Sequence, residues 1–178
     1  MIKNIEKYLN ICDEIALFSK CLSRKIGVLI VTPDFTIVNS GYNGPPRLCP
    51  HCDSKERLDW LVERIQKEKV GDIRNFLLDN GFGKRCPRQI MGFRSGEGLS
   101  LCQAGHAEAN AIANCSREGI GAKGNWIIMN CSLPCQECCK MIIGAGITKV
   151  ICVDAPDYDL GSRWILNNAG VEIIQIKR

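Results

Sequence analysis

The stretch GHAEANAI at residues 105–112 organises this sequence, together with the stretch PCQEC at residues 134–138. The two stretches supply one imidazole, from His106, and two thiols, from Cys135 and Cys138. One nitrogen and two sulfur donors suit Zn²⁺, which favours tetrahedral sites and keeps a fourth position open where it is catalytic. The sequence therefore predicts a zinc site with these three side chains as its ligands.

Both stretches carry the signals of a helix start. A helix that begins near His106 directs His106 and Glu108 inward from its first turn, so we expect Glu108 beside the metal without binding it. Cys135 and Cys138 are three residues apart, so both can reach one metal from the start of a second helix, where the helix dipole favours thiolates. Pro134 fits just ahead of that start. We therefore expect two helix N-termini to meet at the metal, with Glu108 as the catalytic carboxylate.

The two-part pattern H-x-E and P-C-x-x-C resembles the signature of zinc-dependent nucleobase deaminases. The resemblance implies hydrolytic deamination, in which zinc lowers the pKa of a water molecule towards about 7. Glu108 then carries protons from that water to the ring nitrogen and the leaving amine. The alternative is a structural zinc site with Glu108 as an ordinary charge at a helix N-terminus. A structural site usually closes with a fourth protein ligand, and the spacing of Glu108 does not suit that role.

Composition points to a soluble globular protein in a reducing compartment. The chain has 178 residues, of which 46% are hydrophobic and 24% charged, and its net charge of +4 permits an anionic substrate without demanding nucleic acid. Charged residues interrupt the N-terminal segment, so we expect no secretory signal. No apolar segment approaches the roughly 18 residues of a membrane span. Twelve cysteines in such a chain favour metal ligands and buried thiols over disulfides, and hence a cytoplasmic location.

Hydrophobic periodicity predicts an α/β fold in a single domain at 1–178, with a cysteine-rich insertion at about 45–102. The later alternation of strands and helices predicts a parallel portion of the sheet with right-handed crossovers and helices on both faces. The expected elements are a helix at 5–19, a hairpin of strands 26–31 and 35–40 that residue 41 interrupts, a charged helix at 58–70, helix 106–117, strand 125–131, helix 135–145, strand 148–153, helix 160–168 and strand 171–176.

A narrower resemblance covers most of the chain. The stretches that carry it are SKCLSRKIGV at 19–28, GYNG at 41–44, HAEANAI at 106–112, PCQEC at 134–138 and IIGAGI at 142–147. Together they are similar to the deoxycytidylate (dCMP) deaminases of the cytidine deaminase-like superfamily. The H-A-E piece alone fits any member of that superfamily, whereas GYNG combined with HAEANAI is much more specific.

The resemblance implies a three-layer α/β/α sandwich around a five-stranded mixed sheet. It implies conversion of dCMP, and of 5-modified dCMP as a further candidate, to dUMP and ammonia, which supplies dUMP for thymidylate synthesis. It also implies a hexameric assembly and allosteric control, in which dCTP with Mg²⁺ activates and dTTP inhibits. Cys131 stands where the family often has Thr, close to the base, so the shape of the base pocket departs from the family pattern.

Carried over by position, the resemblance also implies substrate contacts. Asn43 would hydrogen-bond the deoxyribose, and Ser23, Arg24 and Lys25 would contact the 5′-phosphate, for which a guanidinium is well suited. The alternatives are a tight turn at 43–44 and a solvated surface pair at 24–25. Asn110 is interpreted as a structural amide of its helix in preference to a ligand contact.

The cysteines and the histidine in the N-terminal portion and in the insertion suggest a second zinc, which some dCMP deaminases carry. A polar insertion with little core of its own gains stability from a metal that cross-links it, and a closed site needs four ligands. We favour Cys21, Cys52, Cys86 and Cys102, with His51 and Cys49 as substitutes. The alternative is that these are ordinary reduced thiols.

Two other functions remain open from the sequence. A deaminase of nucleic acid, acting on tRNA adenosine or single-stranded cytosine, needs a basic track and exposed aromatic residues. An aromatic content of 6% and a net charge of +4 count against it. A non-enzymatic zinc module is disfavoured because Glu108 is intact. We therefore expect a small-molecule nucleotide as substrate, without stable nucleic-acid or membrane binding.

Overall fold

The structure, a computed structural model, describes residues 2–66 and 72–178 and divides into two compact units. The first unit comprises the chain up to Ser19, Ile26–Asn43 and His106–Arg178. The second comprises Lys20–Lys25 and Gly44–Gly105. The longer segment of the second unit corresponds to the insertion that the sequence predicts at about 45–102. The short segment 20–25, which we had placed in the main domain, belongs to this second unit as well.

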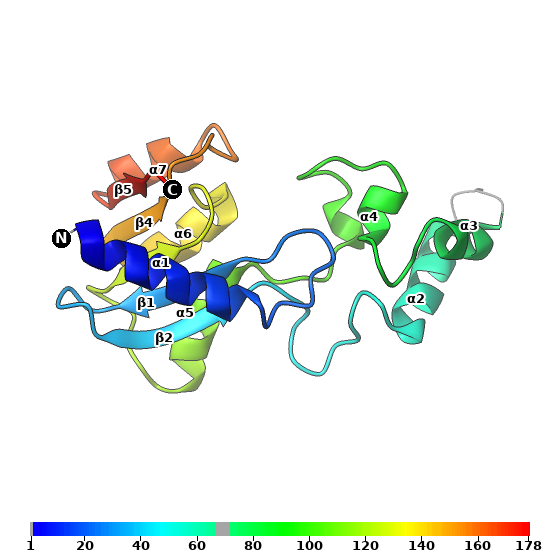
Figure 1. Ribbon diagram of the computed structural model, residues 1–178, viewed down its shortest axis with the longest axis horizontal. Helices are drawn as coiled ribbons and strands as arrows, with labels where there is room; N and C mark the ends of the chain where they lie inside the picture. Colours follow the sequence, from blue (N-terminus) through cyan, green and yellow to red (C-terminus); the bar gives the residue numbers. More distant parts are fainter. Residues whose placement is uncertain (1, 67–71) are drawn as a thin grey trace. The chain divides into compact units, whose positions relative to one another are not determined.

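The first unit is built on a mixed sheet of five strands (Figure 1). The strand order is β2-β1-β3-β4-β5; β1 pairs antiparallel with β2 and β3, and the pairs β3–β4 and β4–β5 are parallel. The predicted five-stranded mixed sheet is therefore confirmed. The bounds are Gly27–Val31 for β1, Ile37–Tyr42 for β2, Trp126–Met129 for β3, Lys149–Val153 for β4 and Glu172–Ile176 for β5.

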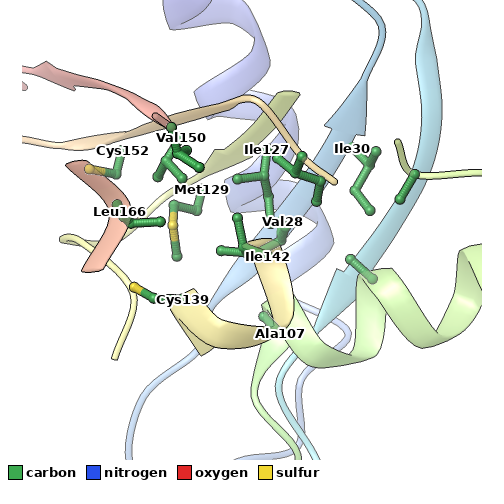
Figure 2. Packing of buried hydrophobic residues seen from close by; sticks show 14 of the residues in the cluster. Val28, Ile30, Ala107, Ile127, Met129, Cys139, Ile142, Val150, Cys152 and Leu166 are labelled. Atoms are coloured by element: carbon green, nitrogen blue, oxygen red, sulfur yellow. The ribbon is translucent and has the colours of Figure 1, made fainter. Parts of the chain in front are cut away.

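Helices cover both faces of this sheet, as the sequence predicts, and make three layers. Alternate side chains of a strand point to opposite faces, so the central strands feed two separate cores. Val28, Ile127 and Val150 pack against α5, α6 and α7 (Figure 2), whereas Leu29 and Ile128 pack against α1. The helix bounds are Ile2–Ala16 for α1, Ala107–Arg117 for α5, Gln136–Gly144 for α6 and Ser162–Asn168 for α7.

The second strand of the hairpin, β2, ends later than the sequence predicts. A turn joins its strands as expected, with the Phe35 N–H donating to the Thr32 carbonyl over 2.8 Å. Strand β2 then continues to Tyr42, although the sequence predicts a break at Gly41. The reason is packing: a Cβ on Gly41 would lie 2.4 Å from the backbone nitrogen of Ala111. The absence of a side chain at Gly41 therefore allows α5 to lie close to β2, and the strand continues through this residue.

The first helix also ends earlier than predicted, at Ala16 and not at Ser19. The backbone N–H groups of residues 17–19 donate to carbonyls three positions back, which closes the helix in tight turns. The buried Ser19 hydroxyl then donates to the Asn43 carbonyl over 2.6 Å. Ser19 thus ties the end of this segment to the end of β2.

The second unit has a hydrophobic core of its own, which corrects our expectation of an insertion with little core. The predicted helical stripe is buried in it, against Ile73, Leu77 and Ile90. The sequence predicts a helix to residue 70, but residues 67–71 lie outside those described. The sequence analysis missed α3, whose N-cap Asp72 accepts from the Asn75 N–H. The elements are α2 at Lys55–Gln66, α3 at Ile73–Asp79, α4 at Pro87–Ile90 and a short 3₁₀ helix, η1, at Leu99–Leu101.

Two further features bear on the sequence predictions. Among the helices of the described residues, none has the length and apolar character needed to cross a bilayer. All twelve cysteines are free thiols, so no pair of them forms a disulfide.

Candidate active site

The three predicted zinc ligands come together at the starts of two helices. His106 is the N-cap of α5 and Cys135 is the N-cap of α6, and both have extended backbone conformations. The Nδ1 atom of His106 lies 3.3 Å from Cys135 Sγ and 3.3 Å from Cys138 Sγ. Zinc bonds of about 2.1 Å to nitrogen and 2.3 Å to sulfur in a tetrahedron would separate the two ligand atoms by about 3.6 Å. The three side chains therefore fit one zinc ion.

The site opens to solvent on one side. His106 is exposed, Cys135 is half-buried and Cys138 is buried, and their ligand atoms lie within 4.8 Å of one another. Within residues 2–66 and 72–178 no other group of His, Cys, Asp or Glu ligand atoms gathers so closely. Three protein ligands on an open face leave a coordination position for a water molecule or a substrate.

The two thiols share one proton. A hydrogen bond from the Cys138 thiol is the largest cause that lowers the pKa of Cys135, to about 4. The same hydrogen bond, together with burial, raises the pKa of Cys138 well above its usual range. Metal binding requires both sulfurs to be deprotonated, so a dication would take the place of that shared proton.

Glu108 lies in the first turn of α5 and only 4% of its surface is exposed. Burial is the main cause that raises the pKa of its carboxyl, and the neighbouring His106 opposes the shift. A carboxyl with a raised pKa can hold a proton as well as release it, which suits proton transfer to a substrate. The position of Glu108 therefore suits the predicted proton carrier. Its carboxyl also interacts with Cys138, one of the predicted zinc ligands on α6.

Helix α5 is held against the edge strand β2 by two side-chain amides. Asn110 Nδ2 donates to the Tyr42 carbonyl over 2.8 Å, and Asn114 Nδ2 donates to the Ser40 carbonyl over 2.9 Å. Asn110 therefore has a structural partner, but this partner lies on β2 and not within its own helix. The role of Asn114 was missed, although its spacing of four residues from Asn110 places both on one face of the helix.

Asn43 is 92% buried at the end of β2, with only 8% of its surface exposed. Its side-chain oxygen Oδ1 accepts from the Ile26 N–H over 2.8 Å, and its own backbone N–H donates to the Ile26 carbonyl over 3.2 Å. Neither Asn43 nor Gly44 has a positive φ. A type I′ turn requires positive φ at both positions, so the alternative of a tight turn at 43–44 is wrong.

The predicted phosphate contacts lie in the second unit. Ser23, Arg24 and Lys25 are all exposed, and Gln89 Nε2 donates to the Ser23 hydroxyl over 3.3 Å. Cys131, in contrast, belongs to the first unit. It is half-buried just after β3, packs against the core, and accepts at its carbonyl from the Val153 N–H over 2.9 Å.

Three of the four cysteines favoured for a second zinc contribute to the raised pKa of the fourth, Cys52. Burial raises the pKa of Cys52 to about 11, the charges of Cys102, Cys21 and Cys86 add to this rise, and the nearby Arg57 opposes it. Such influence falls with distance, so the four thiols surround a common region of the second unit. Their sulfur atoms are not gathered within 4.8 Å as those of the first site are.

The two substitute ligands differ from each other. Cys49 is exposed, whereas the Nδ1 atom of His51 is buried and has no hydrogen-bond partner among the described residues. The buried guanidinium of Arg57, which the sequence analysis missed, donates to the Leu101 carbonyl and lies 4.5 Å from the centre of the Trp60 ring.

The chain was compared with known protein families, curated proteins and solved structures. The family model described as "Cytidine and deoxycytidylate deaminase zinc-binding region" matches residues 2–154. The deoxycytidylate deaminase of Enterobacteria phage T2 is 28% identical over 162 residues, which are 90% of this chain and 85% of that protein. The deoxycytidylate deaminase of Homo sapiens is 30% identical over 157 residues, which are 86% of this chain and 68% of that protein.

Among solved structures, the dCMP deaminase of cyanophage S-TIM5 in complex with dCMP and dUMP resembles the whole chain. The TM-score is 0.65 at 19% sequence identity, and the match covers 99% of this chain and 98% of the other. At that identity the likeness shows a shared fold. The three-layer arrangement predicted from the sequence is therefore found in that structure as well as in this one.

In the metal-free protein, the proton shared by Cys135 and Cys138 should make the alkylation of Cys135 depend on pH differently from that of Cys52. Between about pH 5.5 and 8, alkylation of Cys135 should proceed at a nearly constant rate, because a thiol with a pKa of about 4 is already ionised throughout. Alkylation of Cys52, whose pKa is about 11, should accelerate about tenfold per pH unit. Residue-resolved mass spectrometry after short pulses of iodoacetamide measures both. A tenfold rise per pH unit at Cys135 would contradict the shared-proton arrangement.

Proposed function

Since the chain belongs to the cytidine and deoxycytidylate deaminase family, we propose that it is a zinc-dependent hydrolase that converts dCMP and water to dUMP and ammonia. One observation carries the proposal: His106 Nδ1 and the sulfurs of Cys135 and Cys138 converge, with the buried carboxyl of Glu108 beside them. The product dUMP would supply thymidylate synthesis. The polynucleotide deaminase that the sequence leaves open is not favoured, because the relatives are deoxycytidylate deaminases.

Zinc held by His106, Cys135 and Cys138 would supply Lewis acidity, which lowers the pKa of a water molecule. Glu108 would take one proton from the water whose oxygen attacks the carbon that bears the amino group, and its raised pKa allows it to hold that proton and pass it to the ring nitrogen. It would then carry the second proton of the same water to the departing amine, so that the water supplies the oxygen of dUMP, the proton on the ring nitrogen and the third proton of ammonia. The start of α5 fixes the carboxyl, because Asn110 and Asn114 tie the helix to β2.

We propose Asn43 as the residue that binds the deoxyribose. Its Oδ1 atom accepts from the Ile26 N–H, which fixes the orientation of the carboxamide at the end of β2. We assign the 5′-phosphate to Ser23, Arg24 and Lys25, in which the guanidinium provides a fork of donors for phosphate oxygens. Their exposure in the second unit supports contact with a dissolved nucleotide.

We propose that a second zinc, structural in role, is held by Cys21, Cys52, Cys86 and Cys102. The contributions of Cys21, Cys86 and Cys102 to the raised pKa of Cys52 support this set, and the exposed Cys49 is the weaker substitute. The four thiols come from separate segments of the second unit, so a shared metal would cross-link those segments. Binding would draw the sulfurs closer together than they lie in the structure.

From the family resemblance we also propose a hexameric assembly and activation by dCTP with Mg²⁺. The free state of all twelve thiols supports a reducing, cytoplasmic location. Because Cys131 stands near the expected base pocket, 5-methyl-dCMP is included among the candidate substrates.

The substrate class is tested by ammonia release from dCMP, CMP, deoxycytidine, 5-methyl-dCMP and a single-stranded oligonucleotide, each with and without dCTP and Mg²⁺. We expect kcat/KM for dCMP to exceed that for deoxycytidine by about 100-fold or more, because the nucleoside lacks the charge-assisted hydrogen bonds of the phosphate, worth about 3 kcal/mol together. Equal turnover of deoxycytidine would contradict the phosphate contacts, and turnover of the oligonucleotide alone would contradict the nucleotide substrate.

The proton carrier is tested by Glu108→Gln. We expect kcat to fall by about 10²- to 10⁴-fold, because the amide cannot take up or return a proton, while the zinc content stays unchanged because the side chain is not a ligand. Glu137→Gln is the matched control, since Glu137 also lies in a first helical turn but is exposed and paired with Lys140. Loss of zinc in Glu108→Gln would assign Glu108 a ligand role instead.

The second metal is tested by elemental analysis and thermal unfolding. We expect two zinc ions per chain in the protein as purified from zinc-supplemented cells. Cys52→Ser should reduce this to one and lower the Tm, because the cross-link of the second unit is lost. Cys49→Ser should retain both ions. A single zinc in the unaltered protein would show that these cysteines are ordinary reduced thiols.

A further inference from the structure

The N-terminus of α6 is capped by a residue from a distant loop. A helix begins with backbone N–H groups that lack partners within the helix, and the N-cap side chain usually accepts from one of them. The N-cap of α6 is Cys135, and its sulfur makes no such capping hydrogen bond. Instead, Asp159 Oδ2 accepts from the Gln136 N–H over 2.8 Å. The ligand helix is thus capped from a position 23 residues further along the chain.

The loop that presents Asp159 joins β4 to α7 and is anchored independently of α6. Arg163 donates to both carboxylate oxygens of Asp157, over 2.9 and 2.8 Å, and also to Gln175 Oε1 on β5 over 2.9 Å. The loop backbone also approaches the same ligand helix at Gly161, where a Cβ would lie 2.2 Å from Nε2 of Gln136. Two observations therefore place this loop on the first turn of α6.

We infer that Asp159 is a positioning residue of the zinc site: it accepts from the first N–H of α6 and so fixes the first turn of the helix, which carries Cys135 and Cys138. The side chain of an N-cap residue accepts from the second or third N–H of its helix, so Asp159 holds the helix start from outside without occupying a position that the Cys135 sulfur would use. With the Gln136 N–H occupied by Asp159, the Cys135 sulfur lies 3.3 Å from His106 Nδ1. This inference rests on the proposed zinc ligands but not on the identity of the substrate.

An Asp at this place has an electrostatic cost. Its carboxylate adds negative charge near two sulfur ligands, which by itself disfavours a second anion nearby. The positive end of the helix dipole and the hydrogen bond from the backbone offset that charge. Because an amide oxygen can accept the same hydrogen bond without the charge, Asn at position 159 should preserve the positioning function.

The test compares Asp159→Ala, Asp159→Asn and Asp154→Asn. Asp154 lies at the start of the same loop and is exposed, so it serves as a charge-matched control. The rate of zinc release to a chromogenic chelator is measured for each protein, and the phase that disappears in His106→Ala identifies the catalytic zinc. The Tm, and kcat and KM for dCMP, are measured alongside.

We expect Asp159→Ala to release the catalytic zinc about 10- to 100-fold faster, as for other residues that orient metal ligands, with a lower kcat and a KM changed much less. Asp159→Asn and Asp154→Asn should release zinc at nearly the original rate. Unchanged zinc release in Asp159→Ala with a lowered Tm would reduce Asp159 to an ordinary helix cap and overturn the inference. Equally fast release in Asp159→Asn would overturn it too, because the hydrogen-bond acceptor would then be insufficient. Zinc release does not depend on turnover, so failure of the dCMP assignment would leave this result readable.

Discussion

The close approach of α5 to the edge strand β2 is the contact on which the rest of the site depends. Gly41 has no side chain, and Ala107 and Ala111 present backbone atoms where a larger residue would stand. Asn110 and Asn114 then bind carbonyls of the strand on either side of that glycine. Packing without voids makes such a contact rigid. The position of the α5 N-terminus, and with it His106 and Glu108, is set by this contact.

The parallel half of the sheet brings the other parts of the site to the same region. In open α/β sheets, the loops after the carboxyl ends of the strands carry the functional groups. The chain leaves β3 and reaches Cys135 and Cys138, and it leaves β4 and reaches Asp159. Because β3 and β4 are parallel neighbours, the loops that follow them meet, which gives Asp159 access to the start of α6. The topology thus supplies metal ligands from one loop and the cap of the ligand helix from the next.

What the sequence predicts well is local, and what it misses depends on partners far along the chain. The two short motifs that contain His106 and the pair Cys135 and Cys138 are recognised from neighbouring residues alone, as are the apolar strands. Gly41 was predicted to break a strand because glycine does so locally, whereas its partner Ala111 lies 70 positions further on. Asp159 carries no local signal, since its acceptor role exists only when β4 lies beside β3. The core of the second unit was missed because Leu77 and Ile90 complete a stripe that begins at Leu58.

The charges of the site explain why its assembly and its metal are linked. The buried carboxyl of Glu108, two sulfurs and the carboxylate of Asp159 gather at the N-termini of α5 and α6. Helix dipoles offset part of that negative charge. In the metal-free protein the sulfurs also retain a shared proton, which lowers the pKa of Cys135 and raises that of Cys138. On the proposed assignment, a dication would neutralise the same group without a proton on either sulfur, and Glu108 would be the acid–base group that remains. The arrangement proposed to bind the metal would therefore also leave Glu108 to transfer protons.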